Sequence, residues 1–291
     1  MKPAVIAIVK GGLGNQFFIY AAARALALRT NRSLFLDRSR GYTKETYGRS
    51  YRLDRFPIRA ETMPEAWRVA PTLKHAKHRF VRAISRFIPQ SFRGYHAERK
   101  QLDATQLTQL KPRRLRVMLN GYWQSGSFFE DHAATIRTEL QLPVPTDDLN
   151  LRLGREYATE SSVFLHVRRV RYRQLLEAGY YQKAIDEACE QAGATRFLIF
   201  GDDPQWALDN LQFHGRPAEV ISHNSDDEIA DLWLMSRCRH AIAANSSFSW
   251  WAAWLGGEST PERRVWFPSE TGLQLQAAAG WSIISATVHG P

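Results

Sequence analysis

Two adjacent arginines stand where the sequence predicts the end of a buried strand. Residues 163–167 form a short apolar run that contains His166, and Arg168 and Arg169 follow it directly. Ligands of open α/β sheets bind outside the carboxyl ends of the strands, and paired arginines suit a diphosphate. The pattern predicts a diphosphate site, with His166 in contact with phosphate or base. A solvated arginine pair is the alternative.

Two carboxylates follow the next predicted strand, 196–200, after one glycine. Asp202 and Asp203 could accept hydrogen bonds from a base edge or a ribose hydroxyl, and such oxygens could also bind Mg²⁺. Because Pro204 then begins a helix, capping of that helix is the alternative.

Small polar residues follow a third predicted strand, 241–244, and begin a helix. Hydroxyls and open N–H groups at a helix N-terminus suit a phosphate. For the serines the alternative is a plain N-cap, and for the aromatic residues it is core packing. The run consists of Asn245, Ser246, Ser247 and Phe248, with Trp250 and Trp251 further along.

A glycine turn stands near the N-terminus, between the apolar run 4–9 and a predicted helix over 15–28. Glycines let a backbone approach a ligand closely, and the helix start supplies N–H groups. The spacing is that of neither a dinucleotide fingerprint nor a P-loop, and a tight turn without a ligand is the alternative. The candidate residues are Gly12, Gly14, Asn15 and Gln16.

Strands and helices alternate around these residues, which predicts an α/β protein. Prolines and acidic residues over 143–148 predict a linker between two Rossmann-like domains, 1–145 and 146–291, facing a cleft. The strands are expected at 4–9, 33–36, 116–119, 163–167, 196–200, 218–221, 241–244 and 265–267. The helices are expected at 15–28, 180–191, 204–211, 226–235 and 246–255, with Gly193 closing the second.

The composition excludes several classes of protein. With 291 residues and 44% hydrophobic residues, the chain can bury a large core. Two cysteines are too few for a disulfide framework or a thiolate zinc site. No apolar run approaches the roughly 20 residues that span a bilayer. We therefore expect a soluble, cytoplasmic protein without a thiolate zinc site.

The net charge of +10 is concentrated in one segment, the basic strip 68–116, which has 13 basic and 2 acidic residues. Residues 74–88 within it predict a basic amphipathic helix. Such a charge suggests an anionic partner: nucleic acid, a membrane surface or a phosphorylated molecule. No recognised nucleic-acid motif is present, so we expect no nucleic-acid partner.

Several segments together resemble the α-1,2-fucosyltransferases of glycosyltransferase family 11. The resemblance runs in order through nearly the whole chain. Its segments are Gly11 to Ala21, Gly121 to Ser125, His166 to Arg169, Tyr180 to Ile185, Phe200 to Asp203 and Asn245 to Trp254.

The resemblance implies a GT-B fold and an inverting, metal-independent transfer of L-fucose from GDP-fucose. The acceptor would be a galactose hydroxyl of a glycan, and no cofactor is implied. In related enzymes the first arginine of the pair holds the β-phosphate. The implied contacts are Arg168 and Ser246 to Phe248 with the phosphates, Asp202 and Asp203 with guanine, and Asn15 and Gln16 with the transferred sugar.

One departure from the family pattern follows the arginines, where Val170 and Arg171 replace Gly-Asp. This change could alter the donor sugar, weaken turnover or strengthen diphosphate binding. By position alone, Asp37 and His166 are the candidates for the general base.

Three other interpretations stay open at this stage: a degenerate, non-catalytic nucleotide-sugar binder, a transferase that uses another nucleotide sugar, and a nucleic-acid protein suggested only by charge. The basic strip predicts contact with an anionic acceptor or with the inner membrane leaflet that carries it. A solvated basic face is the alternative.

Overall fold

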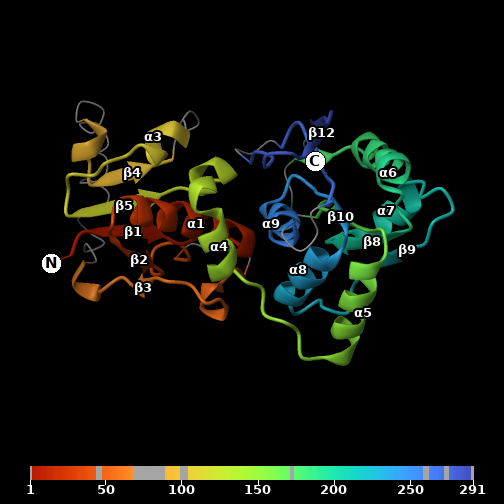
Figure 1. Cartoon of the computed structure of the whole chain (residues 1–291), viewed down its shortest axis with the longest axis horizontal. Coiled ribbons are helices and arrows are strands. Elements are labelled where there is room, and N and C mark those ends of the chain that lie inside the picture. The colour runs from red at the N-terminus through yellow and green to blue at the C-terminus, as the bar shows by residue number, and fades with distance from the viewer. Residues whose placement is uncertain are drawn as a thin grey trace. The chain divides into compact units, whose positions relative to one another are not determined.

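The computed structural model describes residues 2–43, 48–67, 89–98, 104–170, 174–257, 262–271 and 275–289. The chain divides into two units, Met1–Leu140 and Gln141–Pro291. Each unit has its own parallel sheet with helices packed on it, so the predicted α/β class is confirmed (Figure 1).

The first unit is built on a five-stranded sheet of order β3-β2-β1-β5-β4, in which every pairing is parallel. Its central strand is entirely buried, as expected of an apolar strand covered on both faces. The strands are β1 (Ala4–Ile8), β2 (Ser33–Asp37), β3 (Glu61–Thr62), β4 (Tyr95–Ala97) and β5 (Arg116–Asn120).

The long helix α1 (Leu13–Arg29) packs on this sheet and is buried around most of its circumference. A helix that is apolar on all sides belongs in a core, which fits its alanine-, leucine- and phenylalanine-rich sequence. The described part of this unit also contains two short helices, α3 (Ala104–Thr108) and α4 (Ala133–Glu139). Arg24 of α1 and Glu139 at the end of α4 form an ion pair of 2.7 Å that joins these two helices.

The second unit is built on a six-stranded parallel sheet of order β12-β11-β10-β6-β8-β9. Counted along this unit, that order is 3-2-1-4-5-6 read from the β9 edge, which is the order of a dinucleotide-binding sheet. The strand order reverses between β6 and β10. The strands are β6 (Ser162–Val167), β8 (Arg196–Gly201), β9 (Ala218–Val220), β10 (His240–Ile242), β11 (Val265–Pro268) and β12 (Ser282–Ile284). A separate antiparallel pair joins β7 (Leu175–Leu176) to β13 (Val288–His289).

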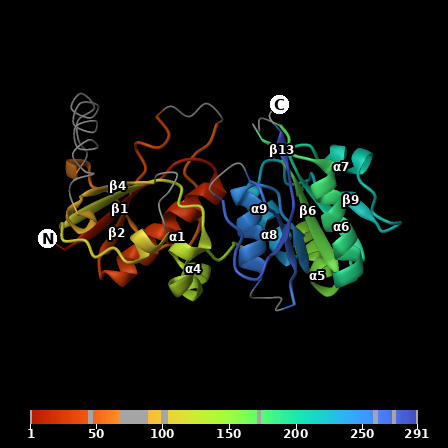
Figure 2. The same cartoon turned by 90° about the horizontal axis from the view of Figure 1, so that it is seen from above.

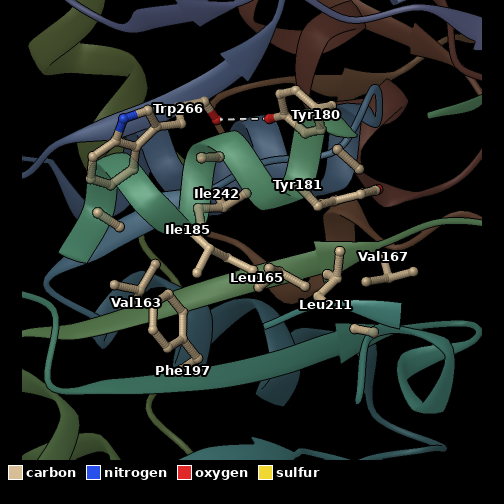
Figure 3. Close-up of a cluster of buried hydrophobic side chains, with 14 of the residues drawn as sticks. Val163, Leu165, Val167, Tyr180, Tyr181, Ile185, Phe197, Leu211, Ile242 and Trp266 are labelled. Atoms are coloured by element: carbon tan, nitrogen blue, oxygen red, sulfur yellow. Dashed lines mark hydrogen bonds between the residues drawn. The ribbon is translucent and has the colours of Figure 1, made fainter. Parts of the chain in front are cut away.

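Helices cover both faces of this sheet (Figure 2). One face carries α6 (Ala178–Ala192) and α7 (Pro204–Asn210), and the other carries α5 (Asp148–Thr159), α8 (Glu228–Arg237) and α9 (Ser247–Gly256). Figure 3 shows the core under α6, where alternate β6 residues Val163, Leu165 and Val167 meet Tyr181 and Ile185. Because side chains alternate along a strand, His166 of β6 belongs to the opposite face, where α9 lies.

Most predicted elements are confirmed to within two residues, including the end of α6, where Gly193 adopts the left-handed conformation with φ 58°. The inclusion of Asp148 in an irregular linker is wrong, because α5 begins there and the Asp147 side chain caps it by accepting from Asn150 N. In the sequence, the neighbouring prolines mask the capping acid that starts this helix. The predicted helix over 74–88 lies outside the described residues.

Candidate active site

The reversal of strand order in the second unit brings together residues that are about 80 positions apart in the chain. His166 lies near the carboxyl end of β6, and the run that begins at Asn245 follows the neighbouring β10. The rings of His166 and Phe248 are 5.9 Å apart at their centroids. Such a switch point is where ligands bind in open α/β sheets.

Asp202 organises the two arginines at this edge. Its Oδ2 lies 3.3 Å from Nη1 of Arg168, and its Oδ1 accepts from the backbone N of Arg169 at 2.7 Å. Gly201 makes this approach possible: its φ is 141°, and a Cβ there would lie 1.8 Å from the carbonyl oxygen of Val167. The carboxylate thus orients the arginine loop, and contact between Asp202 and guanine stays a prediction.

The two arginines differ in their surroundings. The guanidinium of Arg169 lies 4.0 Å from the ring centroid of Trp206, and its Nη1 donates to the carbonyl of Leu176. Arg168 keeps 32% of its side chain exposed. A guanidinium held by a carboxylate and open to solvent suits an incoming phosphate, so the geometry favours Arg168 as the phosphate contact.

His166 is almost completely buried, with 3% of its surface exposed. Burial and, to a smaller extent, the positive charge of Arg168 together lower the pKa of His166 to about 3. The imidazole is therefore neutral near pH 7 and is a weak base. This environment favours contact with a ligand over a role as general base.

The start of α9 combines structural and open groups. Ser246 is its N-cap, with Oγ accepting from Phe248 N, and Asn245 is buried, with Nδ2 donating to the carbonyls of Gln174 and Thr271. The capping interpretation therefore fits Ser246. Ser247 and Phe248 are partly exposed at the same end of the helix. Core packing is confirmed for the two tryptophans that follow, which are fully buried: Trp250 and Trp251.

Asp203 occupies the N-cap position of α7, but its side chain makes no capping hydrogen bond. It is partly exposed beside Asp202. The capping alternative thus receives no support from a side-chain contact, and binding of a nucleotide by Asp203 stays a prediction.

The first unit has a comparable edge, where the loop after β1 meets the loop after β5. These strands are neighbours, and Nε2 of Gln124 donates to Oδ1 of Asn15 at 2.7 Å. Gly11 has φ 78°, and a Cβ there would lie 2.9 Å from Nδ2 of Asn15 and 3.3 Å from the ring of Tyr122. Two segments recognised separately in the sequence are therefore in direct contact.

The remaining residues of the glycine turn have structural surroundings. Gly12 is the N-cap of α1, and Gly14 is buried in its first turn. Gln16 is fully buried, and its Nε2 donates to the carbonyls of Gly11 and Ser50 while its Oε1 accepts from Arg52 N. These contacts hold the loop at Ser50, so direct contact between Gln16 and a sugar stays a prediction.

Asp37 is also held by its neighbours. It is 1% exposed, and its Oδ2 lies 3.0 Å from Nε of Arg40. Its Oδ1 accepts from both the backbone N and the hydroxyl of Ser39. A carboxylate engaged in this way is poorly placed to accept a proton, and its role as a base receives no support from these contacts.

The sequence interpretation missed two charged residues at this edge, Lys10 and Glu98. Nζ of Lys10 donates to Oδ1 of Asn120 at 2.9 Å and lies 4.7 Å from the ring centroid of Tyr122. Burial lowers the pKa of Lys10, and the charge of Glu98 partly opposes this shift. The position of Lys10 just past the carboxyl end of a buried strand was the signal that could have found it.

A polar cavity of about 360 Å³ opens at the start of α5 and α8. Asn150 and Asn224 form its inner wall and bond to each other, and Asn224 also donates to Asp231. Burial raises the pKa of Asp231 to about 6. The inner amides are thus engaged with protein partners.

The described residues contain no group of three or more His, Cys, Asp or Glu side chains that could hold a metal ion. Within the same ranges, none of the helices has the length and apolar character needed to cross a bilayer.

Residues 4–262 match the family described as Glycosyl transferase family 11. The chain belongs to glycosyl transferase family 11. The predicted resemblance is thereby confirmed, and with it a glycosyltransferase activity.

Curated relatives of this family 11 enzyme include two from Escherichia coli. An alpha-1,2-colitosyltransferase is 31% identical over 263 residues, covering 86% of this chain and 87% of the relative. The O-antigen biosynthesis glycosyltransferase WbnK is 28% identical and covers 92% and 96%. The galactoside 2-alpha-L-fucosyltransferase SEC1 of Bos taurus is 26% identical, and the match covers 86% of this chain and 64% of that protein.

Two solved structures of similar fold are fucosyltransferases. NodZ alpha-1,6-fucosyltransferase, soaked with GDP-fucose, has a TM-score of 0.51 at 15% identity and covers 88% of this chain and 93% of that one. A variant of Arabidopsis thaliana FUT1 in complex with GDP has a TM-score of 0.51 at 13% identity, covering 88% and 69%. At these identities the likeness concerns the fold, and the predicted GT-B fold of two Rossmann-like parts is confirmed.

Proposed function

We propose that this family 11 enzyme is an inverting fucosyltransferase that moves L-fucose from GDP-fucose to a galactose hydroxyl of a glycan, in α-1,2 linkage. The observation that carries the proposal is the pair Arg168–Asp202 at the switch point of the second sheet, beside the start of α9. The relative from Bos taurus, named as a galactoside 2-alpha-L-fucosyltransferase, supports the linkage.

The chemistry requires charge stabilisation at the leaving group. In an inverting transfer, an acceptor hydroxyl attacks the anomeric carbon from the face opposite the departing GDP, and negative charge grows on the β-phosphate. Arg168, oriented by Asp202, neutralises that charge. The positive end of the α9 helix dipole stabilises the same charge. In this proposal, these groups stabilise the leaving-group charge without a metal ion.

The remaining candidates take supporting roles in this proposal. His166 and Phe248, in ring contact at the same edge, bind the nucleotide. In the first unit the partly exposed Asn15 amide contacts an oxygen of a sugar. A carboxamide is not a base, so its task is to orient a hydroxyl. Asp203 accepts from the nucleoside.

A second candidate donor is a colitosyl nucleotide, which the 31% identity to an alpha-1,2-colitosyltransferase favours. The residues that follow Arg169 differ from the family pattern, with Val170 48% exposed beside the arginines. The donor choice is therefore best decided by measurement with both sugars.

Contact of the basic strip with an anionic acceptor or a membrane surface stays a prediction, because residues 68–88 and 99–103 of it lie outside the described ranges. In its described part, the Arg113 guanidinium lies 5.1 Å from the ring of Phe92, and that of Arg116 lies 4.1 Å from the ring of Trp67.

The experiment is a thermal-shift panel with GDP, UDP, GDP-fucose and GDP-mannose, followed by mass spectrometry of β-galactosides incubated with the enzyme and donor. We expect GDP and GDP-fucose to raise the unfolding midpoint and UDP to leave it unchanged. The product should carry one additional fucose. An equal shift with UDP, or transfer of a colitosyl but not a fucosyl group, contradicts the proposal.

A further inference from the structure

Glu98 follows β4, and its side chain accepts hydrogen bonds from the loop that follows the adjacent strand β5. Its Oε2 accepts from the backbone N of Tyr122 at 2.5 Å, and its Oε1 accepts from the backbone N of Trp123 at 2.9 Å. Each oxygen of one carboxylate therefore holds one of two consecutive peptide N–H groups. Charged acceptors form stronger hydrogen bonds than neutral ones, so this is a firm clamp on the segment 121–125.

The clamped segment has a conformation that needs support. Trp123 is fully buried and has φ 55°, in the left-handed region that non-glycine residues rarely adopt. That conformation costs a residue with a Cβ about 1 to 2 kcal/mol. Gly121 allows the clamp to approach, because a Cβ there would lie 2.3 Å from the Cβ of Glu98. The Glu98 carboxylate thus stabilises a turn that would otherwise be unfavourable.

The clamp has a consequence for Asn15. Gln124, 7% exposed and next to Trp123, donates from Nε2 to Oδ1 of Asn15 at 2.7 Å. This bond engages the amide oxygen of Asn15 as an acceptor. The NH₂ group of Asn15 then remains as a hydrogen-bond donor on a partly exposed side chain. The chain of contacts runs from Glu98 through the turn and Gln124 to the orientation of one amide.

We propose that Glu98 is a positioning residue: by clamping the turn 121–125 it fixes the Asn15 amide so that Nδ2 donates to an oxygen of a bound sugar. The sugar contact rests on the proposed transferase function, whereas the clamp does not. The ligand class is a neutral polyol oxygen, because the group presented is an uncharged donor.

The first test is Glu98→Gln, which keeps the size of the side chain but places an NH₂ opposite one of the two peptide N–H groups. We expect kcat for transfer to fall by roughly tenfold to a hundredfold, since a misplacement of about 1 Å at a reactive site can cost that much. GDP affinity, a property of the second unit, should change by less than about twofold. Glu130→Gln, at an exposed glutamate of the same unit, is the matched control. Wild-type kcat in Glu98→Gln overturns the proposal.

A second variant separates positioning from general loss of structure. Gln124→Met leaves the Glu98 clamp intact and removes only its link to Asn15, so it should lower kcat to a similar extent. If Glu98 acts through Asn15, the double variant Glu98→Gln with Asn15→Ala should be no slower than Asn15→Ala alone. If the fold-losses in kcat of the two single variants multiply in the double variant, the proposal is overturned.

A readout without turnover keeps the clamp testable if the transferase assignment fails. In protein with ¹⁵N-labelled asparagine, the side-chain NH₂ signal of Asn15, assigned by its disappearance in Asn15→Ala, should shift in Glu98→Gln and in Gln124→Met. It should stay in place in Glu130→Gln. A shift without any fucose transfer by the wild-type enzyme supports the clamp and contradicts the proposed function. An unmoved signal contradicts the clamp.

Discussion

The two sheets of this enzyme have similar carboxyl edges, but these edges present different chemical groups. In each unit, loops that follow two adjacent parallel strands meet at the carboxyl edge, after β6 and β10 in one and after β1 and β5 in the other. The edge of the second unit presents an arginine oriented by Asp202. The edge of the first presents the Asn15 amide, oriented by Gln124.

The difference shows how a carboxylate can serve two purposes. Asp202 contacts the charged side chain of Arg168 directly. Removal of the Asp202 carboxylate therefore changes both the position of the guanidinium and the net charge beside it. Glu98 accepts hydrogen bonds from two backbone N–H groups and acts on Asn15 at a distance. Variants at the second edge should therefore affect nucleotide affinity and turnover together, whereas variants at the first should affect turnover alone.

The largest effect is expected for Arg168→Ala. Loss of the group that meets the growing charge should lower kcat/KM at least a hundredfold, in the range of about 10² to 10³ known for single charge-stabilising donors. The unfolding midpoint should change little, because the side chain is 32% exposed. Steady-state kinetics checks this, with Arg239→Ala, at an arginine paired with the exposed Glu262, as the control. Turnover close to that of the wild type would contradict the charge-stabilising role of Arg168 at the edge of the second unit.

His166 should make the second unit sensitive to acid. Because burial lowers its folded-state pKa to about 3, below the unfolded value of about 6.5, the unfolded chain takes up the proton first. The stability contributed by the neutral ring is present above about pH 6.5 and is lost progressively as the pH falls towards 3. Between pH 7 and pH 5 this amounts to about 2 kcal/mol.

Urea unfolding of wild type and His166→Gln as a function of pH measures this loss. The variant should show a shallower decline in the free energy of unfolding between pH 7 and pH 5. Identical slopes would mean that the imidazole is accessible to protons in the folded enzyme.

Asp202→Asn should weaken GDP binding by about tenfold, since it removes a charge-assisted contact worth roughly 1.5 kcal/mol. Calorimetric titration with GDP measures the effect. Asp209→Asn, at the exposed end of α7, is the control and should bind as the wild type does. An unchanged affinity would show that Arg168 keeps its position without its carboxylate.

Asn15→Asp is the smallest expected effect on binding and tests the first unit. The substitution replaces the NH₂ donor by a carboxylate oxygen, so kcat should fall by roughly tenfold to a hundredfold, at least as much as in Glu98→Gln, while GDP affinity stays within about twofold. Parallel calorimetry and kinetics check this. A loss of GDP affinity equal to that of Asp202→Asn would remove the distinction between the two edges.

Prediction from the sequence was most successful where a local pattern decides the structure. The apolar runs at β1 and β6 and the glycine Gly193 at the end of α6 specify two strands and a helix stop from their own residues. It failed at α5, whose helix carries Gly154 in its middle. A Cβ at that glycine would lie 2.3 Å from the ring of Trp233, so the residue serves close packing between α5 and α8.

The family, the α/β class and the position of nearly every candidate residue at the end of a strand follow from the amino-acid sequence. Those properties depend on short patterns and their order along the chain. Tertiary structure alone decided which groups are occupied and which are presented: Gln16 and Asp37 are engaged with neighbouring groups, while Arg168 and Asn15 are oriented towards solvent-accessible edges. The physical reason is that hydrogen-bond partners such as Asp202 and Glu98 come from distant segments, which only the pairing of parallel strands brings together.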